Sequence, residues 1–135
     1  MIKKITALFS LLLIAFSSSL FAQGDRKIIA VINKADWCPV CQINGEKVMN
    51  EVMPVFKESG VLFMMNDLTD ESTKEDSKKM LEEKKIFEAV KKIKSTGLIL
   101  LVDAMTGKLL EKISVAEPAE KLIEAIRKKS MAVKV

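Results

Sequence analysis

Two cysteines, Cys38 and Cys41, stand in the stretch W-C-P-V-C and are the only cysteines in the chain. Their spacing suits three kinds of chemistry: thiol–disulfide exchange, binding of a soft metal, or a structural disulfide. A bridge between them would close a very short loop, and the stability gained from loop closure grows with loop length. A structural disulfide here would therefore contribute little, which favours redox exchange.

Metal binding and an inert pair remain the alternatives. A closed zinc site usually has four Cys or His ligands, and the chain has no histidine and no further cysteine. Copper(I) is soft enough to be held by two thiolates, with a methionine sulfur as a further ligand. Most methionines after Met1 lie on predicted apolar faces, which favours a packing role for them. The sequence therefore predicts no metal site and no bound cofactor, with a copper(I)-binding or redox-inactive module as the second hypothesis.

The first cysteine is expected to begin a helix. Residues 27–33 form a nearly continuous apolar run, typical of a strand buried on both faces. After a short loop, Pro39 fits the first helical position, where its missing N–H costs nothing. A helix N-terminus favours a thiolate and lowers the pKa of Cys38. We expect Cys38 to be the nucleophile and the more exposed sulfur, and Cys41, one turn later, to resolve the mixed disulfide.

The rest of the pattern predicts a single α/β domain with the element order β-α-β-α-β-β-α. Strands are expected at 27–33, 61–65, 98–103 and 108–114. Helices are expected at 38–56, at 73–92 and from Pro118 onward. Pro54 is expected to end or kink the first helix. The inner face of the second is expected to carry Met80, Phe87, Val90 and Ile93. The two strand-helix-strand units predict parallel strands, and the final hairpin adds an antiparallel edge. The result is a mixed four-stranded sheet flanked by helices, with the cysteines at a strand's carboxyl end, where active residues gather.

The N-terminal segment has the layout of a secretory signal peptide. Lys3 and Lys4 precede an apolar run, and small residues lead to Ala22. The run is shorter than the about 20 apolar residues of a membrane span. We expect a signal peptide at 1–22, cleaved near Ala22, followed by one exported (periplasmic or secreted) domain at 23–135; an uncleaved anchor is the alternative. The net charge of +4 falls to +2 on cleavage because residues 1–22 hold two lysines and no acid, so nucleic acid is not an expected partner.

The motif W-C-P-V-C, after a buried strand and before a helix in this element order, resembles the thioredoxin family over about residues 27–129. The stretch Asn66-Asp67-Leu68-Thr69 is similar to exported thioredoxin-like domains of the disulfide-interchange type. The resemblance implies a thiol–disulfide oxidoreductase without an organic cofactor, acting on disulfide-containing protein substrates. Cys38 would attack and Cys41 would resolve. A reducing role is favoured and needs an electron donor at the membrane, whereas an oxidising role needs an acceptor; the oligomeric state stays open.

Residues beside the cysteines are expected to contact substrate: Trp37, Pro39, Val40, Thr96 and Gly97. Trp37 could equally be a packing residue of the loop. Three positions depart from the family pattern. Gly97 stands where the family usually carries a cis-proline that holds substrate and discourages metal binding. Ile32 replaces a buried acid, and Pro39-Val40 replaces glycine-proline, the dipeptide that tunes the redox potential. The direction of electron flow therefore stays open.

Overall fold

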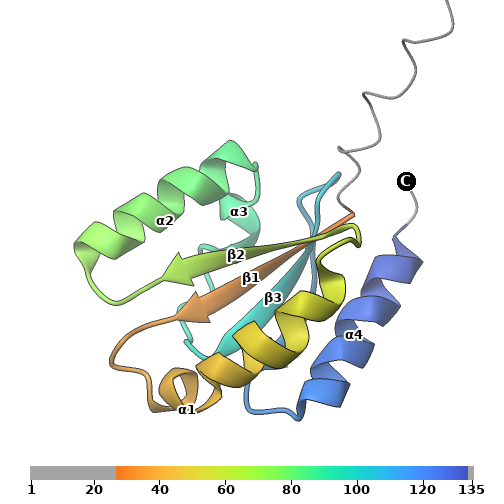
Figure 1. Ribbon diagram of the computed structural model, residues 1–135. Coiled ribbons are helices and arrows are strands. Elements are labelled where there is room, and N and C mark those ends of the chain that lie inside the picture. Colours follow the sequence, from red (N-terminus) through yellow and green to blue (C-terminus); the bar gives the residue numbers. More distant parts are fainter. Residues whose placement is uncertain (1–26, 134–135) are drawn as a thin grey trace, which may run out of the picture.

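A computed structural model describes residues 27–133, which form a sheet covered by helices on both faces (Figure 1). The strands are β1 (Ile28–Lys34), β2 (Val61–Asp67), β3 (Leu98–Asp103) and β4 (Leu109–Ser114). The helical segments are α1 (Pro39–Lys47), the π-helix η1 (Val48–Val52), the 3-10 helix η2 (Met53–Phe56), α2 (Glu71–Glu83), α3 (Phe87–Val90) and α4 (Ala119–Ala132). The predicted mixed four-stranded sheet flanked by helices is confirmed. The predicted signal peptide at 1–22 lies outside the described residues.

The sheet has the order β2-β1-β3-β4. β1 is parallel to β2 but antiparallel to β3, and β3 and β4 form an antiparallel pair. The prediction of a parallel third strand is therefore wrong. A parallel strand needs a connection that returns to the amino end of the sheet. Here α2 runs back along the sheet, and the chain through α3 returns to the carboxyl end of β1, where the Gly97 N–H donates to the Asn33 carbonyl at 2.8 Å.

Each face of the sheet has its own hydrophobic core. Side chains alternate along β1, so that Ile28, Ala30 and Ile32 point to one face and Ile29 and Val31 to the other. The first set packs with apolar residues of η1, η2 and α4, and the second packs with apolar residues of α2 and α3. This double burial explains why β1 reads as a nearly continuous apolar run.

The predicted first helix is helical throughout, but its type changes along its length. Cys38 is the N-cap of α1 and Pro39 its first residue, as predicted. The α-helix becomes a π-helix at Val48 and a 3-10 helix at Met53. Pro54 cannot donate a backbone hydrogen bond, so a regular α-helix cannot continue through it. The regular α-helix ends at Lys47, before Pro54 is reached.

The second helix is shorter than predicted and buries a different face. α2 ends at Glu83, and Lys85 has a positive φ of 60° that separates it from α3. Leu81 is fully buried, whereas Met80 is 44% exposed, so the prediction that Met80 faces inward is wrong. The helix starts at the Asp70 capping box with Thr73, and its buried residues are Ser77 and Leu81.

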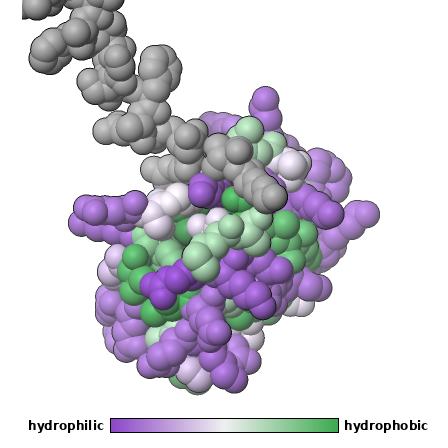
Figure 2. All heavy atoms as spheres, turned by 90° about the vertical axis from the view of Figure 1, so that its right-hand side faces the viewer, coloured by the Kyte–Doolittle hydropathy of each residue, from purple (hydrophilic) through white to green (hydrophobic). Residues whose placement is uncertain are grey.

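Within residues 27–133 no helix has the length and apolar character that a membrane span requires. Figure 2 views the molecule from the right-hand side of Figure 1 and shows hydrophilic residues spread around a smaller apolar area. Most Lys and Glu side chains of α2 and α4 are exposed.

Candidate active site

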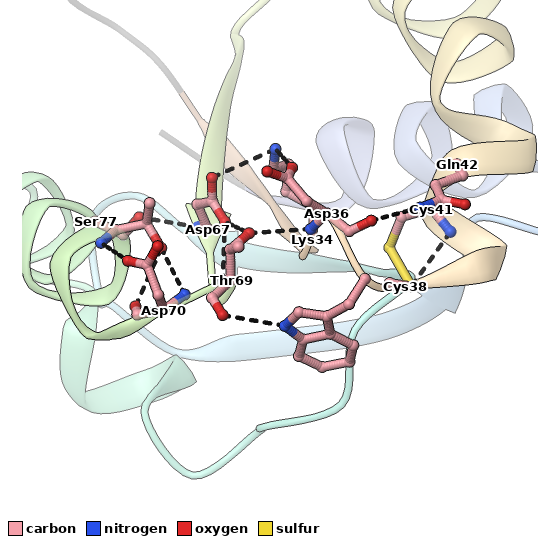
Figure 3. Close-up of polar contacts among 11 residues, drawn as sticks. Lys34, Asp36, Cys38, Cys41, Gln42, Asp67, Thr69, Asp70 and Ser77 are labelled. Carbon is pink, nitrogen blue, oxygen red and sulfur yellow. Dashed lines mark hydrogen bonds and ion pairs between the residues drawn. A yellow bond between two sulfur atoms is a disulfide. The ribbon is translucent and has the colours of Figure 1, made fainter.

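The two cysteines lie where β1 ends and α1 begins, joined as a disulfide with a Cα–Cα distance of 5.3 Å. The Cys41 N–H donates to the Cys38 sulfur at 3.3 Å (Figure 3). The sulfur thus takes the place of the side-chain oxygen that normally caps a helix. A backbone N–H and the positive end of a helix both favour a negative charge at this position. The site can therefore stabilise a Cys38 thiolate when the disulfide opens.

The exposure of the two cysteines is the reverse of the prediction. Cys38 is 4% exposed, whereas Cys41 is partly exposed. The prediction that Cys38 is the more accessible of the pair is therefore wrong for the disulfide form. The Cys38 N–H donates to the buried Ala35 carbonyl at 3.1 Å, and this tight turn folds Cys38 back toward the end of the sheet. One turn along α1, Cys41 is partly exposed and lines a pocket.

Gly97 lies against the W-C-P-V-C motif. It has a φ of 77°, and a Cβ atom added there would lie 3.1 Å from the Val40 Cγ1. Its N–H donates to Asn33, and its carbonyl accepts from the Val115 N–H at 2.9 Å. Both backbone groups of Gly97 are therefore used inside the protein. The structure brings the predicted contact residues Val40 and Gly97 together, with Thr96 beside them and partly exposed.

An apolar strip follows the exposed side of the motif. Trp37 is 60% exposed and Val40 is 40% exposed, and Pro39 between them is also exposed. Ile43, one turn after Val40, is 80% exposed and extends this strip. Sequence reasoning missed Ile43 because apolar residues of a helix were assigned to the core. Its spacing of three from Val40 was the available signal.

A second loop holds the Trp37 loop in place. The Trp37 indole N–H donates to the Thr69 carbonyl at 3.1 Å, and the Asp36 N–H donates to the Thr69 Oγ1 at 3.0 Å. Asp67 in turn accepts hydrogen bonds from the N–H and hydroxyl of Thr69. Figure 3 shows this chain of contacts from the end of β2 to the indole ring. The loop after β2 therefore positions the residues that precede Cys38.

Lys34 joins the two loops electrostatically. Its Nζ lies 3.2 Å from an Asp36 oxygen and 3.4 Å from an Asp67 oxygen. The hydrogen bond to Asp36 raises the pKa of Lys34; burial opposes this effect, and Asp67 adds to it. Burial alone would raise the pKa of Asp67, but hydrogen bonds from Thr69 and the charge of Lys34 outweigh it and lower that pKa. Sequence reasoning missed the role of Lys34 because this residue belongs to no recognisable motif.

Two buried amides hold the loop before β3. The Asn66 Nδ2 donates to the Asn33 Oδ1 at 2.8 Å. The Asn33 Nδ2 donates to the carbonyls of Ile93 at 3.0 Å and Ser95 at 3.2 Å. Asn33 is fully buried, so these bonds replace the water that its amide gives up. The sequence signal for these hydrogen bonds was an asparagine in an otherwise apolar strand.

A pocket of about 280 Å³ opens beside Cys41, between α1, η1 and the end of β1. Its apolar lining includes Ile32, Val48, Met49 and Met65. Two of the methionines thus share a pocket with one cysteine. Within residues 27–133 no group of three or more His, Cys, Asp or Glu residues could hold a metal ion.

No protein-family model matches the chain, and no curated protein sequence matches it. Among solved structures, thioredoxin from Fasciola hepatica is 21% identical, with a TM-score of 0.49 over 78% of this chain and 83% of that one. The protein described as Trxlp from Edwardsiella tarda is 15% identical, with a TM-score of 0.48 over 75% and 82%. A DsbH oxidoreductase is 16% identical, with a TM-score of 0.48 over 76% and 74%.

Proposed function

We propose that this chain is an exported thiol–disulfide oxidoreductase that exchanges electrons with protein substrates through Cys38 and Cys41. The observation that carries the proposal is the Cys38–Cys41 disulfide at the N-terminus of α1, with the Cys41 N–H directed at the Cys38 sulfur. A thiolate stabilised in this way both attacks and leaves readily in disulfide exchange.

The reducing reaction proceeds in two displacements. The Cys38 thiolate attacks one sulfur of a substrate disulfide, forming a mixed disulfide and releasing the other substrate sulfur as a thiolate. The Cys41 thiolate then attacks the Cys38 sulfur, which closes the Cys38–Cys41 bond and releases the substrate as a dithiol. The chain is oxidised by two electrons and the substrate is reduced by two. The reverse sequence oxidises a dithiol substrate.

The surroundings of the pair suit a protein substrate. The exposed strip of Trp37, Val40 and Ile43 can contact apolar side chains beside a substrate cysteine. Pro39 is exposed beside Val40, and Gly97, which follows the partly exposed Thr96, lies against the Val40 side chain. A reducing role is favoured by the resemblance to thioredoxins. It requires an electron donor at the membrane, since an exported compartment does not regenerate thiols by itself.

The first experiment measures the reduction potential of the cysteine pair by equilibrating the mature chain with glutathione buffers. The fluorescence of Trp37, the sole tryptophan, monitors the fraction that is reduced. A reduction potential near about −270 mV supports a reductase, whereas about −120 to −180 mV supports an oxidase or isomerase. If no reversible disulfide forms, the proposed function is wrong.

The roles of the two cysteines are tested by reduction of a disulfide-containing protein. We expect Cys38→Ser to abolish turnover and Cys41→Ser to accumulate a mixed disulfide with substrate. Asn50→Ser, an exposed change on η1, is the control and should keep wild-type activity. Turnover by Cys38→Ser at the wild-type rate would disprove the assignment of the nucleophile.

Copper(I) binding is the second candidate, favoured by the pocket that Cys41 shares with Met49 and Met65. Thiolate and thioether sulfurs are the ligands that copper(I) prefers. The reduced chain would be titrated with copper(I) against a chelator of known affinity. Stoichiometric binding that weakens in Met65→Leu, in a chain without disulfide turnover, would favour this candidate over the oxidoreductase.

A further inference from the structure

The segment from Lys84 to Lys94, which contains α3, is strongly basic. Its sequence K-K-I-F-E-A-V-K-K-I-K holds five lysines and one glutamate, which gives it a formal charge of +4. All five lysine side chains are exposed: Lys84, Lys85, Lys91, Lys92 and Lys94. The apolar side chains of the segment are buried or half-buried. The surface that this segment offers to a partner is therefore dominated by positive charge.

This basic segment leads directly to the cysteine site. Only Ser95 and Thr96 separate it from Gly97, and a Cβ atom added to Gly97 would lie 3.1 Å from the Val40 Cγ1 in the motif. The carbonyls of Ile93 and Ser95 accept hydrogen bonds from the Asn33 amide at 3.0 and 3.2 Å. The end of the basic segment is therefore fixed to the end of β1, close to the start of the motif.

A further pocket of about 440 Å³ lies between this segment, α2 and Trp37. Its apolar lining includes Trp37, Phe87 and Ile93. Four lysines and two glutamates also line it, and the lysines are Lys74, Lys78, Lys91 and Lys94. Trp37 directly precedes Cys38, so a group bound in this pocket lies next to the redox pair. The pocket thus joins an apolar lining to an excess of positive charge beside the nucleophile.

The pocket lysines are available to a carboxylate from outside. Three of them pair with glutamates one helical turn away, in the pairs Lys74–Glu71, Lys78–Glu82 and Lys91–Glu88. Ion pairs between exposed side chains such as these contribute little, so an incoming carboxylate can replace the glutamate. Lys94 has no ion pair with any residue in the range 27–133.

We propose that the preferred substrates carry acidic side chains beside their disulfide, and that these bind the lysines of segment 84–94 and of the adjoining pocket while Cys38 attacks. This inference rests on the proposed function and leaves its two displacements unchanged. Charge complementarity of this kind raises the encounter rate and orients the docked partner. An anionic membrane surface is the less favoured partner, because the segment exposes no large apolar side chain that could enter a bilayer.

The test uses two peptides that differ only in having glutamates or glutamines beside a single cysteine. Each cysteine is linked by a disulfide to thionitrobenzoate, and the reduced chain releases this chromophore when it attacks. Each rate is divided by the rate with 2-mercaptoethanol, which removes the intrinsic reactivity of the peptide. At low ionic strength we expect the Glu peptide to react about tenfold faster than the Gln peptide. This preference should vanish in about 1 M salt, where the Debye length is about 3 Å.

The position of the charge is tested with matched variants. Lys91→Glu/Lys94→Glu reduces the charge of segment 84–94 to zero and should abolish the preference for the Glu peptide. Lys121→Glu/Lys128→Glu makes the same change of charge on α4, which covers the other face of the sheet (Figure 1). This control should retain the preference. All four lysines are exposed, so neither variant disturbs a core. A Glu preference that survives in Lys91→Glu/Lys94→Glu overturns the proposal.

Failure of this inference and failure of the proposed function give different results. If the wild-type chain reacts with both peptides at the same normalised rate, recognition of acidic substrates is wrong and exchange chemistry stands. If it also binds vesicles of phosphatidylcholine and phosphatidylglycerol through Lys91 and Lys94, the basic segment contacts a membrane instead. If the reduced chain releases no thionitrobenzoate and forms no Cys38–Cys41 disulfide, the proposed function fails and this inference fails with it.

Discussion

Cys38 combines structural and chemical tasks in one side chain. Its sulfur caps α1 by accepting the Cys41 N–H, and the same sulfur is the nucleophile in the exchange reaction that we propose. The group that stabilises the thiolate is a backbone N–H of the helix itself, so it stays in place whatever the neighbouring side chains are.

At the residue scale, we expect that replacing Gly97 by alanine or by proline destabilises the fold. Proline is the residue that the thioredoxin family, which the sequence resembles, usually has at this position. Gly97→Ala places a Cβ against Val40 at a φ of 77° and should lower the free energy of unfolding by about 1–2 kcal/mol. Gly97→Pro should cost more, because proline cannot adopt this φ and loses the hydrogen bond to Asn33. Urea unfolding of both variants checks the order. A proline variant as stable as the wild type would contradict this account.

At the element scale, Asn33 connects β1 with the end of β2 and with the loop before β3. Asn33→Ala removes the partner of Asn66 and leaves the carbonyls of Ile93 and Ser95 without its amide. We expect a loss of about 2–3 kcal/mol of unfolding free energy, together with faster hydrogen exchange at the Gly97 N–H. The exposed change Asn50→Ala is the control. Unchanged exchange at Gly97 would show that the amide does not hold this loop.

The ion pair between Lys34 and Asp67 joins the loops after β1 and β2 and predicts a pH dependence. The folded-state pKa of Asp67 lies below its ordinary value of 3.8, so its contribution to stability is present above that pH and is lost as the pH falls further. The pKa of Lys34 lies above 10.5, so its contribution is present below that pH and lost as the pH rises through the folded value.

Unfolding measured from neutral pH down to about pH 2 tests this sign. The stability difference between wild type and Asp67→Asn should shrink on the acid side, because protonated Asp67 no longer pairs with Lys34. Glu75→Gln, an exposed change on α2, should run parallel to the wild type. A constant difference for Asp67→Asn across this range would exclude the ion pair as the cause.

At the scale of the whole molecule, stability depends on the central strands. Leu101 on β3 is fully buried in the core beneath α4 and η1, and it pairs with Ala30 and Glu111. Leu101→Ala should lower the free energy of unfolding by about 2–5 kcal/mol, because the cavity closes only in part. Met105→Ala, at a side chain that is 76% exposed, should change it by less than about 0.5 kcal/mol. Comparable losses in the two variants would contradict the core assignment.

The sequence predicted the parts of the fold that local patterns encode. β1 and β3 were identified because strands buried on both faces are continuously apolar, and the start of α1 because Pro39 marks a first helical turn. The direction of β3, the inner face of α2 and the burial of Cys38 were predicted wrongly. Each depends on contacts between residues far apart in the chain, such as Gly97 with Asn33, which have no local pattern.

The last two residues of β1 constrain which positions of this protein can change during evolution. Asn33 and Lys34 hold both loops that flank the cysteines, whereas Ile43 and Met49 stand exposed at the rim of the site. Substitutions at the rim can alter the choice of partner while the framework persists, so new specificities are reachable by single mutations. A change at Asn33 disturbs three hydrogen bonds at once, so that residue is expected to vary more slowly than those at the rim.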